Sequence, residues 1–154
     1  MVINLTFFLE LIANKVLVTA VLGWFVAQVL KVILVLICDR RFDISRMIGS
    51  GGMPSSHSSF VTSLATAVAF ESGVSSPLFA VCGVLAFVVM YDASGVRRET
   101  GRQAEIINDI IESFGSGDTQ LAGKKLKELI GHSPIEVFAG AVLGVAIGLL
   151  MYLL

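Results

Sequence analysis

Two histidines in this chain stand at the starts of apolar segments, where a histidine can act on a phosphate ester. His57 follows the run Gly51-Gly52-Met53-Pro54-Ser55-Ser56. Main-chain N–H groups at glycines and at a helix start point towards anions, and serine hydroxyls can cap such a start. Gly52, Ser55 and Ser56 are therefore candidate phosphate ligands, and His57 can pass a proton to a bound oxyanion. A capped turn without any ligand is the alternative.

The second histidine, His132, directly precedes Ser133-Pro134-Ile135-Glu136. Serine at the N-cap, proline at the first helical position and glutamate at the third predict a capping box, which explains these residues without catalysis. It does not explain His132. The helix dipole favours the neutral imidazole, which suits a nucleophile, and Glu136 can hold the ring in one tautomer.

Three groups of cations accompany the histidines. Lys31 lies inside the first long apolar segment, and an intramembrane lysine is a functional candidate, although its long side chain could instead reach the interface. Arg40 and Arg41 follow. Since each helical residue turns by about 100°, Arg40 shares a ligand with Lys31 only if the helix ends near position 39. Arg97 and Arg98 leave the third apolar segment and can serve as phosphate ligands or as headgroup anchors.

The elements that must position these side chains are membrane helices. The 154 residues are 55% hydrophobic and 15% charged, with a mean hydropathy of +0.86, which is typical of an integral membrane protein. We expect an all-α polytopic bundle of about four transmembrane helices in a single domain, residues 1–154. The four apolar segments are 16–38, about 59–70, 77–91 and 135–154, and the shorter segment 1–13 is expected at the interface.

The basic residues indicate an orientation. Of the eleven Lys and Arg residues, nine fall in two stretches that follow the first and third apolar segments. With four spans these stretches lie on one side, which the positive-inside rule places in the cytoplasm. We therefore expect a plasma-membrane protein whose site faces the cytoplasm. The basic residues of the two stretches are Arg40, Arg41, Arg46, Arg97, Arg98, Arg102, Lys124, Lys125 and Lys127.

Residues 92–133 are expected to form a polar helical insertion on that side. Apolar residues recur at helical spacing over 106–114, and a second amphipathic helix is predicted at about 119–130. Glu105, Asp109 and Glu112 share one helix face, which favours a solvated surface over a metal site. We expect no metal, no other cofactor and no nucleic-acid partner. Gly140, Gly144 and Gly148 share a face that suits either packing within the chain or a homo-oligomer.

These motifs resemble those of the type 2 phosphatidic acid phosphatase (PAP2) superfamily. Pro54-Ser55-Ser56-His57 is similar to its Pro-Ser-Gly-His, and His132 followed by Glu136 is similar to the His and Asp that end its third motif. The arginines depart from the parent pattern, because Arg40 and Arg41 lie further from Lys31 and no proline follows them. Over nearly its full length the chain resembles the small divergent PAP2 membrane proteins.

The resemblance implies a lipid phosphatase that needs no metal. His132 would form a phosphohistidine, Glu136 would orient it, and His57 would protonate the leaving alkoxide. The phosphoryl oxygens would be held by Lys31, Ser55, Ser56, the Gly52 backbone, one of Arg40 and Arg41, and one of Arg97 and Arg98. Phosphatidylglycerol phosphate and phosphatidic acid are candidate substrates. The alternatives are a protein that binds lipid headgroups or assists transport without hydrolysis, and a vanadate-dependent peroxidase.

Overall fold

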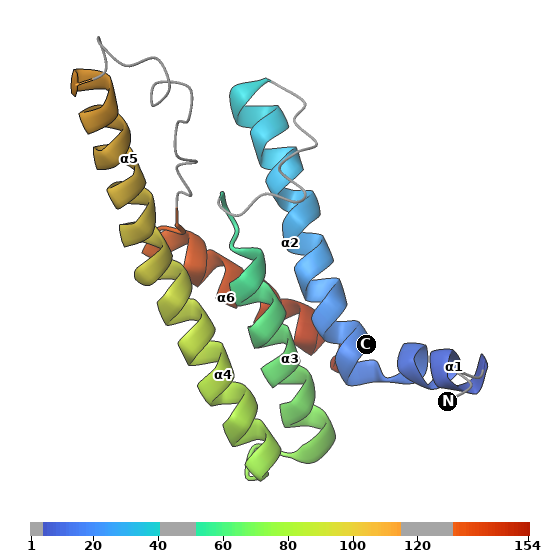
Figure 1. Cartoon of the computed structure of the whole chain (residues 1–154). Coiled ribbons are helices and arrows are strands. Elements are labelled where there is room, and N and C mark those ends of the chain that lie inside the picture. The colour runs from blue at the N-terminus through green and yellow to red at the C-terminus, as the bar shows by residue number, and fades with distance from the viewer. Residues whose placement is uncertain (1–4, 41–51, 115–130) are drawn as a thin grey trace.

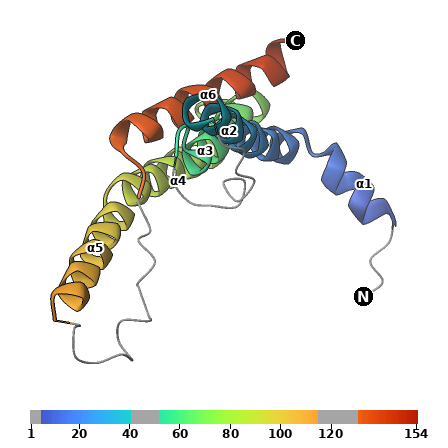
Figure 2. The same cartoon turned by 90° about the horizontal axis from the view of Figure 1, so that it is seen from above.

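The computed structural model describes residues 5–40, 52–114 and 131–154, which form six helices and no strand within these ranges. The prediction of an all-α fold is therefore confirmed. α3 lies in the middle, with α2, α4 and α6 packed around it, and α1 turns aside from the start of α2 (Figures 1 and 2). The helices are α1 Leu5–Ala13, α2 Lys15–Asp39, α3 Ser56–Ser72, α4 Pro77–Ser94, α5 Val96–Phe114 and α6 Pro134–Leu153.

Local sequence signals fix the helix ends. The Asn14 side chain accepts a hydrogen bond from the Leu17 N–H at 3.0 Å and caps α2, which ends where Arg40 adopts a left-handed conformation with φ of 50°. Ser76 caps α4 before a proline at the first helical position. The predicted capping box at the start of α6 is present, with Ser133 as its N-cap. The helix ends lie close to the ends of the predicted apolar segments, and of these three N-caps only Ser133 is predicted from the sequence.

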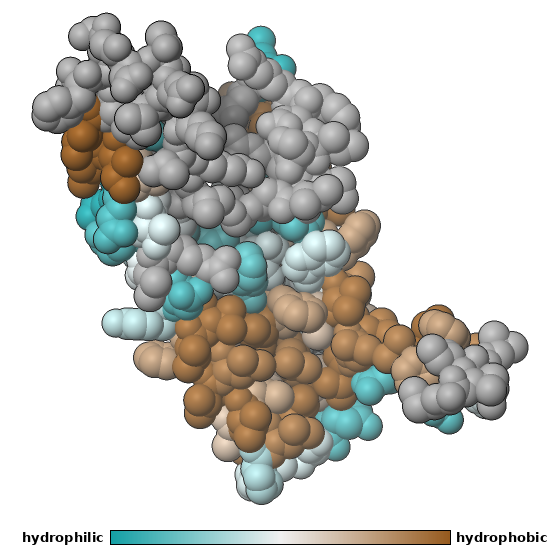
Figure 3. Space-filling model, viewed as in Figure 1, coloured by the Kyte–Doolittle hydropathy of each residue, from teal (hydrophilic) through white to brown (hydrophobic). Residues whose placement is uncertain are grey.

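Three helical stretches are long and apolar enough to cross a bilayer, namely Lys15–Cys38, Pro77–Ile110 and Pro134–Leu153. α3 has 17 residues and is not among them, so the expected number of four transmembrane helices is not confirmed. Most residues of α3 are covered by α2, α4 and α6, and several of the buried ones are serine or threonine, which lowers the hydropathy of this helix. Apolar side chains form a belt across α4 and α2 in the lower part of the molecule, with polar residues above it (Figure 3).

The glycine face of α6 packs against α3 of the same chain. Gly140, Gly144 and Gly148 are buried, and a Cβ atom at any of them would collide with α3. At Gly144 the collision would involve the Thr62 hydroxyl and the Ser59 carbonyl. This close approach allows the Thr62 hydroxyl to donate to the Ala141 carbonyl at 3.1 Å. Of the two roles that the glycine spacing allowed, packing within the chain is the one observed.

α5 follows α4 almost without a break and extends beyond the bundle (Figure 1). The Gly95 N–H donates to the Tyr91 carbonyl at 2.9 Å, which closes α4 just before α5 begins. The amphipathic helix predicted over 106–114 therefore belongs to a longer helix. Its apolar residues Ile106, Ile107 and Ile110 are exposed. The helix predicted at 119–130 lies outside the described residues.

Candidate phosphate site

The starts of α3 and α6 lie side by side. The Ser55 N–H donates to the Glu136 carbonyl at 3.0 Å, so the two first turns are joined through the main chain. The Ser55 hydroxyl caps α3 by accepting from the Ser58 N–H at 3.4 Å and from the Ser58 hydroxyl at 3.1 Å. Each helix start carries a partial positive charge from the helix dipole, although side-chain caps pair some of its N–H groups. Two such ends at one place favour an anion.

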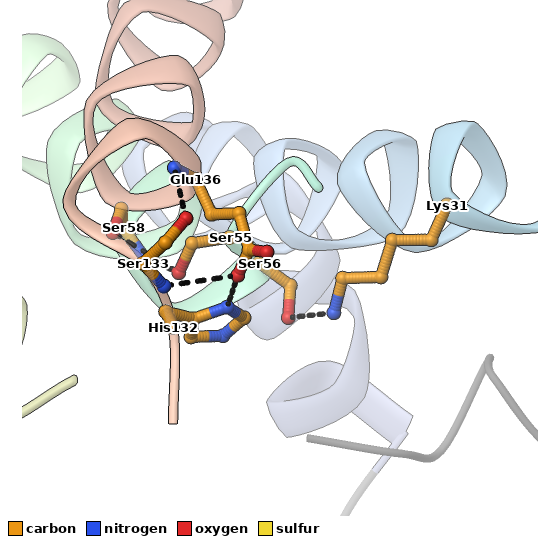
Figure 4. Close-up of polar contacts among 7 residues, drawn as sticks. All are labelled: Lys31, Ser55, Ser56, Ser58, His132, Ser133 and Glu136. Carbon is orange, nitrogen blue, oxygen red and sulfur yellow. Dashed lines mark hydrogen bonds and ion pairs between the residues drawn. The ribbon is translucent and has the colours of Figure 1, made fainter. Parts of the chain in front are cut away.

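His132 is held between α4 and α6. Its N–H donates to the Ala93 carbonyl at 3.1 Å, and its ring Nδ1 lies 2.9 Å from Glu136 Oε2 (Figure 4). A carboxylate only accepts hydrogen bonds, so Nδ1 carries a proton, and in the neutral imidazole Nε2 keeps its lone pair. The same carboxylate oxygen accepts from the Ser133 N–H at 3.3 Å. The Glu136 side chain thus serves both the capping box and the contact with His132. This accounts for the capping spacing and for the histidine that precedes it.

His57 comes from the first turn of α3 and lies near His132. The centroids of the two rings are 6.0 Å apart, and the ring planes are inclined by 65°. His57 is half-buried, whereas His132 is 3% exposed. This separation allows both rings to contact one phosphoryl group, which is the geometry that a nucleophile and a proton donor require.

Lys31 reaches this place from α2. Its ammonium donates to the Ser56 hydroxyl at 3.1 Å, and its side chain is 2% exposed (Figure 4). The lysine therefore turns inward instead of extending to the surface. Gly52 lies nearby with φ of +85°, since a Cβ atom there would be 4.0 Å from Lys31 Cδ. Residues from α2, α3 and the segment before α3 are brought together as the sequence predicts.

The predicted arginine ligands are less well placed. α2 ends at Asp39, as a ligand shared with Lys31 would require, but Arg40 is exposed and lies about 13 Å further along the helix axis than Lys31. Arg41 lies outside the described residues. Arg97 and Arg98 belong to the first turn of α5, and their side chains are outside the described part of the structure. Their contacts with phosphate remain predictions.

Two groups at the site were not anticipated from the sequence. Ser58 is fully buried and donates to Ser55, which its position one turn after Ser55 could have indicated. The Ala93 carbonyl fixes the main chain of His132. No sequence signal marks it, because its role depends on where α4 ends relative to α6.

Comparisons with known proteins identify the family of the chain. The family model described as the Divergent PAP2 family matches residues 12–147, which include all the described residues of the site. The "Uncharacterized membrane protein YuiD" of Bacillus subtilis (strain 168) is 42% identical over 153 residues, covering 93% of this chain and 97% of that protein. No solved structure matches. The chain is a membrane protein that belongs to the Divergent PAP2 family.

Proposed function

We propose that the protein is a membrane phosphatase that hydrolyses a phosphomonoester of a lipid through a phosphohistidine at His132. The observation that carries this proposal is the 2.9 Å contact between His132 Nδ1 and Glu136, at a place where two helix starts and a buried lysine favour an anion. A buried cation and two helix dipoles would suffice for binding alone. A histidine oriented by a carboxylate adds a nucleophile to that binding site.

The proposed reaction has two steps. His132 Nε2 attacks phosphorus, the P–N bond forms, and the bond to the lipid alkoxide breaks while His57 gives that oxygen a proton. His57 then accepts a proton from water, whose oxygen attacks phosphorus and breaks the P–N bond. Inorganic phosphate leaves, and both histidines return to their starting states. Glu136 stabilises the positive charge that develops on the His132 ring in the first step.

The phosphoryl oxygens would be held by groups already directed at the site. Lys31 supplies a full positive charge, Ser56 supplies a hydroxyl, and the first turn of α3 supplies N–H groups. The first turn of α6 contributes mainly its dipole, because Pro134 has no N–H and the capping box uses that of Glu136. Such fixed donors in a site of low polarity stabilise charge that develops on the oxygens in the transition state. We propose that one of Arg40 and Arg41 and one of Arg97 and Arg98 complete the set when substrate binds.

The substrate and the orientation are inferred from the surroundings of the site. Two of the helices that form it, α2 and α6, are apolar enough to lie in a bilayer, which favours a phosphorylated lipid such as phosphatidylglycerol phosphate or phosphatidic acid. The basic stretches after the first and third apolar segments support a site on the cytoplasmic face of the plasma membrane. A topology reporter fused after Lys125 tests this orientation. If the reporter is found outside the cell, the inferred orientation of the site is reversed.

Trapping the phosphoenzyme is the sharpest test, because the chain has two histidines. We expect purified protein to release phosphate from lipid phosphates and from p-nitrophenyl phosphate. His57→Gln should accumulate an acid-labile phosphoenzyme with p-nitrophenyl phosphate. Its good leaving group needs no proton donor, whereas the attack of water on the phosphohistidine still needs a group that accepts the water proton. His132→Gln should form none. A His132→Gln protein that releases phosphate at the wild-type rate would refute the mechanism, and binding without release in the wild type would favour a headgroup-binding protein.

A further inference from the structure

A groove lies between α4 and α6, in the part of the molecule where both helices are apolar enough to lie in a bilayer. Its volume is about 320 Å³, and no ionisable carboxylate, lysine, arginine or histidine lines it. Aromatic rings form much of its walls. Its lining includes Phe87, Tyr91 and Ser94 of α4 and Pro134, Phe138 and Ala141 of α6.

One end of this groove adjoins the candidate phosphate site. Ser94 follows Ala93, whose carbonyl holds the His132 N–H, and Pro134 stands two residues after His132. From Ser94 the groove follows α4 to Phe87, which corresponds to about 10 Å along the helix axis. Because α4 and α6 run in opposite directions here, the end at Phe87 leads away from the site into the apolar part of the bundle.

The walls of the groove suit a hydrocarbon chain. Phe87, Tyr91 and Phe138 are each about two-thirds exposed although they are large apolar or aromatic residues. The Ser94 hydroxyl donates to the Met90 carbonyl at 3.0 Å, so this polar group already has a partner within its own helix. The lining can therefore offer dispersion contacts along most of the groove, and its side-chain polar groups are the hydroxyls of Tyr91 and Ser94.

We propose that this groove holds one hydrocarbon chain of the lipid phosphate and thereby places its phosphoryl group at His132. The inference rests on the proposed function for the identity of the headgroup. It adds a binding site for the hydrocarbon chain of the lipid. It also adds a route of entry, because a groove on the outer surface of α4 and α6 is open to lateral entry from the bilayer. A headgroup at the site and a chain in the groove would lie in one continuous path.

Filling the groove tests this proposal. Ala141→Phe places a ring in the groove, and Val142→Phe is the matched control, because Val142 is the next residue of α6, is 53% exposed and does not line the groove. Hydrolysis of long-chain phosphatidic acid in nanodiscs is compared with hydrolysis of water-soluble p-nitrophenyl phosphate. We expect Ala141→Phe to lower kcat/KM for the lipid about tenfold or more while the soluble ester changes less than about twofold. Val142→Phe should change neither.

A second variant protects the test against misfolding. Phe87→Trp narrows the groove from α4 and should cause the same selective loss. Equal losses on both substrates, or no loss on the lipid, would overturn the proposal. A change of oligomeric state in Ala141→Phe with unchanged lipid hydrolysis would identify the groove as an interface between copies and would also overturn it.

Photo-crosslinking separates this proposal from the proposed function. Phosphatidic acid with a diazirine in its chain should label α4 and α6 of the wild type around the groove, and Ala141→Phe should reduce this labelling more than Val142→Phe does. Labelling without any phosphate release would support the groove and refute the phosphatase. Labelling spread evenly over the bundle would refute the groove even if hydrolysis is observed.

Discussion

Replacing Gly140 with alanine tests whether the packing of α6 on α3 positions the candidate catalytic groups. A Cβ atom at Gly140 would overlap the Ser55 carbonyl oxygen and would lie 3.0 Å from Ser58 Cβ. The obstacle at Ser55 is main chain, which cannot rotate aside as a flexible side chain could. α6 must therefore move away from α3, and this movement strains the bond from the Ser55 N–H to the Glu136 carbonyl.

The size of the effect follows from two opposing terms. Alanine is favoured over glycine in a helix by up to about 1 kcal/mol. Forcing an extra carbon into a close-packed contact costs about 1–3 kcal/mol. We therefore expect Gly140→Ala to destabilise the protein by about 1 kcal/mol, counting both terms. A displacement of α6 on the order of 1 Å would also misplace His132 and slow phosphate release about 100-fold.

Gly83→Ala provides the matched control. Gly83 lies within α4, and a Cβ atom there would have no neighbour within 4 Å. The same chemical change should then stabilise the protein by up to about 1 kcal/mol and leave phosphate release unchanged. Unfolding in mixed micelles of increasing SDS content gives the stability, and release from p-nitrophenyl phosphate gives the activity. If Gly140→Ala matches Gly83→Ala in both measurements, the α3–α6 contact does not position the site.

Three further substitutions separate stability from binding. Ser133→Ala removes the N-cap of α6 and should cost about 1 kcal/mol in the SDS titration, and an unchanged midpoint would contradict the capping role. Lys31→Met keeps the bulk of a buried side chain but removes its charge, so orthovanadate should bind about tenfold more weakly or worse by calorimetry while stability is kept. Equal vanadate affinity would exclude Lys31 as an anion ligand. Ser59→Ala removes the hydrogen bond to the Gly23 carbonyl at 2.8 Å and should lower the free energy of unfolding by about 0.6 kcal/mol. Vanadate binding should stay unchanged, and weaker binding would show that this contact matters beyond stability.

Much of the site was predictable because its signals are local. Ser133, Pro134 and Glu136 predict a capped helix from their spacing alone, and the capping box is present. Ser55 before an apolar run predicts the start of α3 in the same way. The intramembrane position of Lys31 marks it as a functional candidate but leaves open whether its side chain reaches the interface, and the structure shows it turned inward to Ser56.

Other features depend on tertiary contacts that the sequence does not encode locally. Hydropathy cannot distinguish a helix that faces lipid from one that faces other helices, so the number of spans was not fixed by the short apolar segment of α3. The glycine spacing in α6 predicts a close-packed face but not its partner. The bond from His132 to the Ala93 carbonyl joins residues that are distant in sequence, and no periodicity predicts it.

The central place of α3 has a consequence for how the protein is made. Serine and threonine hydroxyls of α3 donate hydrogen bonds to main-chain carbonyls of α2 and α6, as from Ser59 to Gly23 and from Thr62 to Ala141. α6 follows α3 only after α4 and α5, so a growing chain exposes the polar face of α3 before its cover has been synthesised. Packing of this face of α3 must then await α6, since its polar groups are better covered by a neighbouring helix than by lipid. The start of α3, which lies in the candidate phosphate site, is therefore completed only when the last helix packs against it.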